Sequence, residues 1–274
     1  MRVAIQGFEG CFHQIAAEGY YGKNIEIECC ASFPELVKKV VKQKDADAGV
    51  MAIENSIAGS ILPNYTLLKN SGLHVIGEVY LHIKQHLMVL PGQKLEDIRE
   101  VHSHHMALLQ CTEFLEKYPH MKLVETEDTA LSAKHVQQKK LKSTAAIAGK
   151  LAAEIYGLEI IAPNIHTIKN NYTRFLVISP NGVTPTPDAN KASVYFQTSH
   201  DRGSLAKVLT QVAQAGINLS KIQSFPMPTK EWNYYFHADF EFENLSHFEK
   251  SISKIEPLTE DIKVLGIYKK GNTH

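Results

Sequence analysis

The chain is poor in cysteine, carries no net charge and has no long apolar run. Its four cysteines in 274 residues, Cys11, Cys29, Cys30 and Cys111, show neither the C-x-x-C spacing of zinc and redox sites nor the density of a disulfide scaffold. Basic and acidic residues balance at 29 each, so no overall field favours nucleic acid or an anionic membrane. A small anionic ligand is still compatible with this balance, because it needs only local charge.

The N-terminal stretch MRVAIQGFEG lacks the apolar core and cleavage site of a signal peptide, and no apolar run approaches the length of a membrane span. We therefore expect a cytoplasmic protein. A content of 44% apolar and 21% charged residues is typical of a soluble globular protein, and the length suggests about two domains.

Common motifs for cofactors and activated nucleophiles are missing too, with no Walker A, GxGxxG or GxSxG pattern. Three histidines occur in His102-Ser103-His104-His105, but no C-x-x-C or H-E-x-x-H pattern accompanies them. We interpret this segment as a strand–helix junction with Ser103 as the helix cap. We expect no metal and no cofactor. The remaining hydroxyls, amides and one arginine suit proton donation and anion positioning.

A linker divides the chain at residues 179–190, which contain three prolines, a glycine and no apolar periodicity. Before it, short apolar strands alternate with helical patterns, which favours an α/β sheet with helical crossovers. Residues 1–178 are many for one such layer set, so we expect two α/β lobes with a cleft between them. The predicted strands are 2–6, 25–30, 48–53, 85–90, 98–103, 122–126, 144–148 and 173–178. Two predicted helices begin near residue 12 and at Ser32, and three more cover 105–118, 128–140 and 149–156.

Residues 191–270 follow a different order. The predicted elements are a strand at 191–198, a helix at 203–216, an extended segment at 217–225, a turn at 226–230, a strand over 232–243, a helix at 246–256 and a strand at 263–268. From Trp232 onward apolar and polar residues alternate, which indicates a half-buried strand. The order βαββαβ is the ferredoxin-like one.

The most informative stretch is residues 170–178 (NNYTRFLVI), which places a hydroxyl, a guanidinium and an aromatic ring where a loop enters an apolar strand. In a regular strand Thr173 and Phe175 face one way and Arg174 the other. One ligand can contact all three only if the backbone bends or the ligand wraps around the strand end. Taken alone, such a stretch is more often a polar strand entry with the arginine in a surface ion pair.

Two further loops follow predicted strands. Residues 54–60 (ENSIAGS) offer a carboxylate, an amide and two hydroxyls beyond the carboxyl end of a strand, where ligands of open α/β sheets bind. The alternative is a helix start capped by Asn55 or Ser56. Residues 7–13 (GFEGCFH) place two glycines before a helix, which makes either an anion cradle of backbone N–H groups or a plain turn.

These segments together resemble the prephenate dehydratase family. The motifs that carry the resemblance are Asn171-Tyr172-Thr173-Arg174-Phe175, Glu54-Asn55-Ser56, residues 143–148 (STAAIA), Gly203-Ser204-Leu205 and Gly216-Ile217-Asn218-Leu219. Each motif is weakly specific, whereas the ordered set is strongly so and covers nearly the whole chain. The resemblance implies a catalytic portion at residues 1–178 with two lobes like a type II periplasmic-binding-protein fold, the linker 179–190, and a ferredoxin-like ACT domain at 191–270.

The implied reaction converts prephenate to phenylpyruvate with loss of CO2 and water, in phenylalanine biosynthesis. The threonine of the family's Thr-Arg-Phe motif is essential, so Thr173 is expected to assist the departing hydroxide as a general acid. Arg174 would hold a carboxylate bidentately and Phe175 would pack against the ring. Asn55 and Ser56 are expected to complete the polar shell, with Glu54 orienting them or serving as a second donor, and Asn171 is expected to bind the substrate.

The resemblance also implies phenylalanine as a feedback inhibitor bound by the ACT domain, and a homodimer or homotetramer formed through that domain. The phenylalanine-binding residues expected from it are Gly203, Ser204, Leu205, Asn218, Leu219, Gln223 and Ser224.

Two segments depart from the family pattern. In the first loop, hydroxyl residues that usually follow the second glycine, Gly10, are replaced by Cys11 and His13. Gly10, Cys11 and His13 are expected to line the cleft and bind the substrate, and His13 would titrate near neutrality and alter the pH dependence. The family's Glu-Ser-Arg-Pro stands here as Gln223-Ser224-Phe225-Pro226, which loses both charges; Phe225 is an alternative candidate for stabilising a dimer.

Two alternatives stay open. Arogenate dehydratase acts on a substrate with an ammonium in place of the keto group, and these motifs do not separate the two activities. A non-catalytic phenylalanine sensor would keep both folds but not the turnover, and the intact Thr173 and Glu54-Asn55-Ser56 speak against it.

Overall fold

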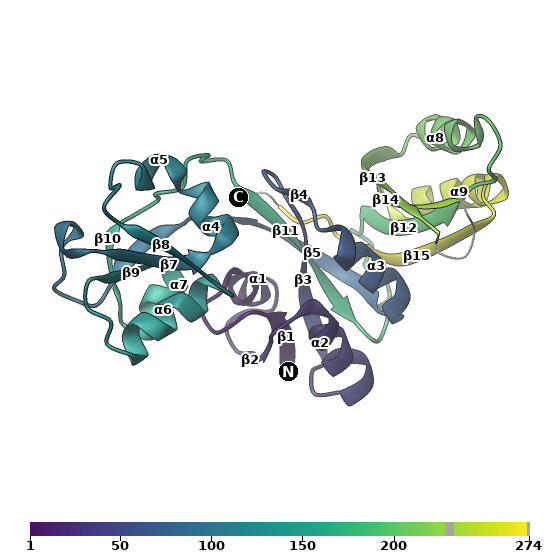
Figure 1. Cartoon of the computed structure of the whole chain (residues 1–274). Helices are drawn as coiled ribbons and strands as arrows, with labels where there is room; N and C mark the ends of the chain where they lie inside the picture. The colour runs from purple at the N-terminus through teal and green to yellow at the C-terminus, as the bar shows by residue number, and fades with distance from the viewer. Residues whose placement is uncertain (228–232, 273–274) are drawn as a thin grey trace. The chain divides into compact units, whose positions relative to one another are not determined.

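The computed structural model describes residues 1–227 and 233–272 and is shown in Figure 1. Its contacts divide the chain into two compact units. The first contains Met1–Asn64 and Val79–Phe175, and the second contains Tyr65–Glu78 and Leu176–Asn272. The domain boundaries predicted after residues 178 and 190 stay a prediction, because the compact units cut the chain at other places.

A six-stranded sheet has the order β2-β1-β3-β11-β5, with the short β4 paired to β3. Its strands are β1 (Arg2–Gln6), β2 (Glu26–Cys30), β3 (Ala48–Asn55), β4 (Gly59–Ser60), β5 (His74–His82) and β11 (Tyr172–Ser179). Strand β1 pairs in parallel with β2 and β3, and the crossovers contain α1 (Phe12–Tyr21) and α2 (Phe33–Lys38). The loops after β1 and β3 therefore meet at the same edge of the sheet.

A five-stranded sheet in the first unit has the order β10-β6-β9-β7-β8. Its strands are β6 (His86–Val89), β7 (Glu100–His104), β8 (Lys122–Thr126), β9 (Thr144–Ala148) and β10 (Glu159–Ala162), and its helices are α4 (His105–Gln110), α5 (Thr112–Leu115), α6 (Thr129–Gln138) and α7 (Lys150–Tyr156). Strand β7 runs parallel to β8 and β9, so the loops that lead into α4 and α6 lie at one edge.

Local sequence explains where these helices begin. Ser32 caps α2 by accepting a hydrogen bond from the Glu35 N–H at 3.4 Å, and Glu35 Oε2 accepts one from the Ala31 N–H at 2.8 Å. Asp128 caps α6 by accepting one from the Leu131 N–H at 2.8 Å. The helix predicted over 105–118 is instead two short helices that meet at Cys111, a buried member of the core beneath the five-stranded sheet.

The prediction that Ser103 caps a helix is wrong. The cap of α4 is His104, whose Nδ1 accepts from the Met106 N–H at 3.2 Å. Ser103 is buried inside β7, where its hydroxyl donates to the Ile147 carbonyl at 2.6 Å. A buried hydroxyl needs a partner, and the neighbouring strand β9 supplies one.

In the second unit, a four-stranded sheet has the order β13-β14-β12-β15 with antiparallel neighbours throughout. Its elements in chain order are β12 (Lys191–Gln197), α8 (Ser204–Gln214), β13 (Asn218–Pro226), β14 (Tyr234–Glu241), α9 (Leu245–Ile255) and β15 (Asp261–Tyr268). This is the predicted βαββαβ order. Residues 228–230 of the predicted turn, and Trp232 of the predicted strand, lie outside the described part of the chain.

Strand β14 is buried on both faces, although its alternation predicts a half-buried strand. Ala238 and Phe240 pack into the core under α8 and α9, and the opposite face carries Tyr235 and His237, which are also buried. Tyr65 of α3 (Leu62–Ser71) covers that second face: its ring lies 4.6 Å from the His237 ring.

Phe225 belongs to the same cluster, because its ring stacks on Tyr235 at 4.9 Å and lies 5.8 Å from Tyr65. It is 6% exposed, so its ring packs inside its own chain rather than offering itself to a dimer partner.

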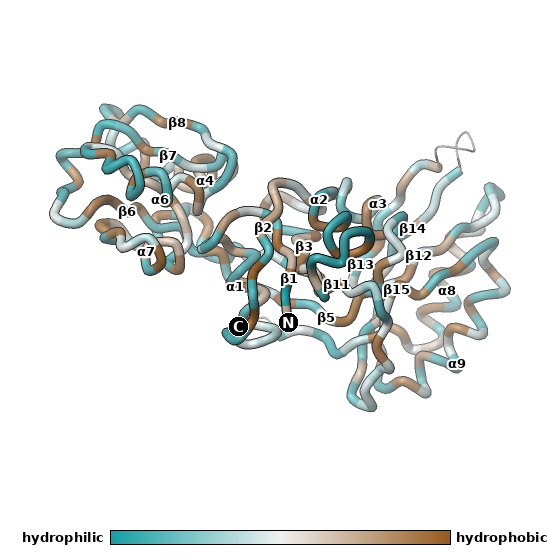
Figure 2. Tube along the Cα trace, turned by 90° about the horizontal axis from the view of Figure 1, so that it is seen from below, coloured by the Kyte–Doolittle hydropathy of each residue, from teal (hydrophilic) through white to brown (hydrophobic). Residues whose placement is uncertain are grey.

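Figure 2 shows the physical basis of these elements. Brown and teal alternate along α8 and α9, as expected of helices that bury one face, and brown segments gather along the strands. Elements absent from the prediction are α3, β4, β5 and β10. Among the helices of the described residues, none combines the length and the apolar character that a membrane crossing requires.

Candidate active site

A cavity of about 310 Å³ opens in the first unit, where the loops after β1, β3, β7 and β8 converge with the start of β11. This volume lies at the lower end of the range for small-molecule sites. The cavity is lined by Gln6, Cys11, Phe12, His13, Ala52, Asn55, Ala58, Ile61, Ile83, Gln85, His104, Met106, Ala107, Gln110, Glu127, Asp128, Thr129, Thr173 and Phe175.

The strand alternation at β11 separates the three residues of the Thr-Arg-Phe motif. Thr173 and Phe175 line the cavity, and Arg174 is not among its lining residues. The Arg174 guanidinium carbon lies 6.0 Å from the centre of the Tyr80 ring, and the side chain is 4% exposed. Strand β11 is regular at this point, so Thr173 faces the cavity and Arg174 faces the other way. This placement gives no support to the predicted contact of Arg174 with substrate.

Asn55 fixes the Thr173 hydroxyl. Its Nδ2 group donates to Thr173 Oγ1 at 3.0 Å, to Asn171 Oδ1 at 2.8 Å and to the Tyr172 carbonyl at 3.2 Å. Its Oδ1 accepts from the backbone N–H groups of Ile57 and Ala58. Asn55 therefore closes its own turn after β3 and joins that turn to β11.

Asn171 extends this network away from Thr173. Its Nδ2 donates to Gln110 Oε1 at 3.0 Å, so the carboxamide of Gln110 is oriented with its Nε2 group left for the cavity. Asn171 is fully buried and does not line the cavity. The amides thus form a connected chain from Gln110 through Asn171 and Asn55 to the threonine hydroxyl.

Ser56 and Glu54 lie outside the cavity lining. The Ser56 hydroxyl accepts from the Tyr172 N–H at 2.9 Å and donates to the Asn170 carbonyl at 3.3 Å. It therefore joins the β3 loop to the start of β11. Glu54 pairs with Ser60 in the small β3–β4 ladder, so the segment after β3 forms a tight turn rather than the alternative helix start.

The loop after β1 lies against the cavity as the sequence predicts. Cys11 and His13 line it, and Gly10 supports them from a backbone φ of +88° that favours glycine. The Gly10 N–H donates to Gln14 Oε1 at 2.7 Å. Burial, together with the nearby Asp128 carboxylate, raises the pKa of the Cys11 thiol to about 12, so Cys11 stays a thiol that donates to the Gln6 carbonyl.

The prediction that His13 titrates near neutrality is wrong. Burial lowers the pKa of His13 to about 3, so the imidazole is neutral across the physiological range. Its Nε2 accepts from the Ala52 N–H at 3.3 Å, which places the ring proton on Nδ1. The ring packs edge-on against Phe175 at 4.9 Å and acts as a wall of the cavity.

The electrostatics of the cavity depend on dipoles and amides, because its lining residues include no lysine or arginine. Two ten-residue helices, α1 and α6, begin at lining residues, and each N-terminus carries the equivalent of about half a positive charge. Asp128 caps α6, and burial raises the pKa of its carboxyl group. The start of α1 has no side-chain cap, so its first N–H groups are the ones available to an anion.

Sequence reasoning missed several residues of the cavity, above all Gln85, Gln110 and Asp128. Glutamines outside any motif carry no spacing signal. Asp128 could have been predicted, because an aspartate that begins a predicted helix after a strand is both a helix cap and a polar group at a strand end.

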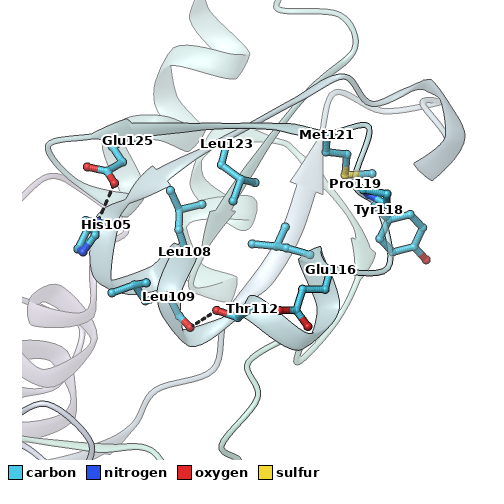
Figure 3. Close-up of a pocket in the computed structure, with 11 residues that line it drawn as sticks. His105, Leu108, Leu109, Thr112, Glu116, Tyr118, Pro119, Met121, Leu123 and Glu125 are labelled. Atoms are coloured by element: carbon cyan, nitrogen blue, oxygen red, sulfur yellow. Dashed lines mark hydrogen bonds and ion pairs between the residues drawn. The ribbon is translucent and has the colours of Figure 1, made fainter.

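A second, apolar pocket of about 550 Å³ lies over α4, α5 and β8 (Figure 3). Leu108, Leu109 and Leu123 surround it, and His105 and Glu125 pair across one end at 2.7 Å. None of the predicted catalytic or substrate-binding residues lines it. We therefore place the chemistry in the smaller cavity.

The predicted effector residues lie in the second unit at two places. Ser204 and Leu205 line a pocket of about 370 Å³ at the start of α8, where Gly203 adopts a φ of +81°. The other four lie on the edge strand β13, outside this pocket: Asn218, Leu219, Gln223 and Ser224.

Comparisons with known proteins identify the family of the chain. A family model described as prephenate dehydratase matches residues 3–182. A chloroplastic protein of Arabidopsis thaliana, arogenate dehydratase/prephenate dehydratase 2, is 36% identical and aligns over 98% of this chain and 72% of its own length.

Two solved structures share the fold. A prephenate dehydratase from Arthrobacter aurescens in complex with L-Phe has a TM-score of 0.87 and 26% identity, over 98% of this chain and 90% of that one. GqqA, described as a novel type of quorum quenching acylase, has a TM-score of 0.88 and 26% identity over 98% of both chains. Since one fold can host different chemistries, the residues of the cavity carry the functional argument.

Proposed function

Because the chain belongs to the prephenate dehydratase family, we propose that its cavity converts prephenate to phenylpyruvate, releasing CO2 and water. The observation that carries this proposal is the hydroxyl of Thr173, which faces the cavity and accepts a hydrogen bond from Asn55. A hydroxyl that accepts a hydrogen bond is polarised and becomes a stronger donor to the next group. The Thr173 proton is then directed at a bound acceptor.

The reaction needs one proton and no oxidant or reductant. The bond between C1 and its carboxylate breaks and releases CO2, the electron pair enters the ring, and the C4 hydroxyl leaves with a proton as water. Aromatisation drives the process, so the main task of the enzyme is to assist the departing hydroxide. Thr173 donates the hydrogen bond at C4, and its proton is replaced from solvent.

The dianion is held without a lysine or arginine in the cavity lining. The uncapped start of α1 at Cys11 and the Nε2 group of Gln110 supply donors for carboxylate oxygens. Phe175 and His13 form an aromatic wall against which the six-membered ring packs. Asn55, Asn171 and Ser56 hold this geometry from behind, and Arg174 acts in our proposal through the packing of β11 rather than by direct contact.

The second unit supplies the regulation in this proposal. Its ferredoxin-like strand order suits an ACT domain, and the Arthrobacter relative was solved with L-Phe bound. We place phenylalanine at the pocket beside Ser204 and Leu205, with the β13 edge joining copies of the chain into a dimer or tetramer. The first unit then corresponds to two lobes like a type II periplasmic-binding-protein fold, in a cytoplasmic enzyme.

Thr173→Val tests the proposal, because valine keeps the shape of threonine and removes the hydroxyl. With prephenate as substrate, phenylpyruvate is followed by its absorbance in alkali. We expect kcat to fall by about 10²–10⁴-fold in Thr173→Val, while Thr173→Ser retains most of the rate. A wild type without turnover would leave the sensor alternative in place; full activity in Thr173→Val would refute only the role of the hydroxyl.

A phenylalanine titration of the same assay tests the regulation. We expect inhibition and binding by calorimetry, both weakened by Ser204→Leu, which fills the pocket at α8. An unchanged rate and oligomeric state at millimolar phenylalanine would refute this part alone.

A further inference from the structure

Gln85 stands out among the cavity residues because its side chain has an unpaired atom. It lies between β5 and β6, lines the cavity and is 3% exposed. Its backbone is fixed on both sides: the N–H donates to His166 Nδ1 at 3.4 Å, and the carbonyl accepts from the Ile165 N–H at 2.9 Å. Yet its Oε1 is buried without a hydrogen-bond partner among the described residues.

An unpaired buried acceptor costs about 1–3 kcal/mol and is uncommon in folded proteins. The other amides beside the cavity do not share this feature, since Asn55, Asn171 and Gln110 pair with one another. The unpaired Oε1 of Gln85 therefore indicates an acceptor for a hydrogen bond that a ligand donates.

The ligand group follows from the chemistry of a primary amide, which offers one acceptor and one donor edge in either rotamer. An α-oxo acid side chain, as in prephenate, presents acceptors only and leaves Oε1 unpaired. An α-amino acid side chain presents an ammonium donor beside a carboxylate acceptor and matches both edges. The cavity lining also contains Glu127 and Asp128 but no lysine or arginine, which suits a substrate with a positive group.

We propose that Gln85 accepts a hydrogen bond from the substrate's α-ammonium and so sets the preference of this site for the amino acid form of the substrate, arogenate, over the oxo acid. This rests on the dehydratase function proposed above. The reaction at the ring is unchanged: arogenate takes up one proton and yields phenylalanine, CO2 and water.

The test compares kcat/KM for arogenate, followed by phenylalanine formation, with kcat/KM for prephenate at initial rates. In Gln85→Leu we expect the arogenate-to-prephenate ratio to fall about tenfold or more, since an unpaired acceptor no longer penalises the oxo acid. Gln85→Glu keeps the acceptor and adds a charge, so the ratio should rise. Gln138→Leu, at an exposed position of α6, is the control and should leave the ratio unchanged.

Each outcome decides one claim. A wild type that converts neither substrate refutes the dehydratase function, whereas a wild type that converts prephenate but not arogenate overturns the role of Gln85. Ratios within twofold of wild type in both Gln85 variants overturn it as well. Should Gln85→Leu fail to fold, as seen by circular dichroism, Gln85→Glu alone carries the decision.

Discussion

At the scale of single residues, the amide of Asn55 determines what the hydroxyl of Thr173 can do. Nδ2 of Asn55 is a donor only, so Thr173 Oγ1 must accept from it, and the hydroxyl proton points to another group. The same amide closes the turn through Ile57 and Ala58, which removes its freedom to rotate. The Thr173 hydroxyl, which is a weak acid, is thus oriented by an Asn55 side chain that is itself held in one arrangement.

His13 provides a test of the burial argument. Its pKa falls from 6.5 in the unfolded chain to about 3 in the fold, so the folded state binds fewer protons between these values. Stability that is present above pH 6.5 is therefore lost as the pH falls, by about 1.4 kcal/mol per pH unit. We expect the wild type to lose about 2 kcal/mol more than His13→Gln between pH 6.5 and 5, measured by urea unfolding.

Glutamine keeps an acceptor for the Ala52 N–H and does not titrate, which makes it the matched variant. Equal losses in the two proteins would show that His13 takes up its proton over the same pH range in the fold as in the unfolded chain. The pH profile of kcat/KM from pH 6 to 8 should also be the same in both proteins, because a neutral imidazole contributes no ionisation there.

At the scale of elements, the site depends on how closely the loop after β1 approaches helix α7. A Cβ on Gly10 would lie 2.8 Å from the Ala152 Cα, closer than real contacts allow. Gly92 has a similar φ of +84° but no atom within 4 Å of such a Cβ. Substituting alanine at each of the two glycines therefore distinguishes the cost of backbone strain from the cost of close packing.

We expect Gly10→Ala to lower the free energy of unfolding by about 1–3 kcal/mol more than Gly92→Ala, because both pay the left-handed strain and only the first overpacks. Gly10→Ala should also reduce kcat, since the loop carries Cys11 and His13 along the cavity. Urea unfolding and the phenylpyruvate assay measure both effects. Equal destabilisation of the two variants would mean that the loop after β1 shifts away from α7 with no loss in the free energy of unfolding.

The elements also show what the sequence could and could not predict. Strands β1, β3 and β9 are nearly continuous apolar runs, and their ends were predicted closely. Helix α3 was missed because its polar and apolar residues do not separate onto two faces. The second face of β14 was misjudged because alternation reports polarity, whereas its burial comes from Tyr65, far away in the sequence.

The same distinction holds in the cavity. Thr173 and Asn55 could be predicted because they follow strand signals and resemble a family motif. Gln110 and Gln85 could not, because their roles arise from partners more than fifty residues away: Asn171 for the first, and His166 and Ile165 for the second. Orientation by a distant partner leaves no trace in local spacing.

At the scale of the whole molecule, the second unit is composed of segments from both sides of the linker, and a buried ion pair joins them. Lys191 Nζ of β12 lies 3.1 and 3.0 Å from the two carboxylate oxygens of Glu78 in β5. The side chains are 1% and 0% exposed. Glu78 also accepts from the Gly271 N–H at 3.0 Å, so the carboxylate is held from two sides.

Removing one partner leaves a charge in a place without water. We expect Lys191→Met to lower the free energy of unfolding by about 3–5 kcal/mol, because the Glu78 carboxylate stays buried without its main counterion. The double variant Glu78→Leu/Lys191→Met should recover most of this loss, since the buried pair is removed together and Glu241, 3.8 Å from Lys191 Nζ, keeps its pair with Lys270. Arg2→Met breaks the exposed pair with Glu26 and should cost at most about 1 kcal/mol. If urea unfolding gave Lys191→Met and Arg2→Met the same cost, water would have to reach Glu78, and the junction of the two segments would be open rather than packed.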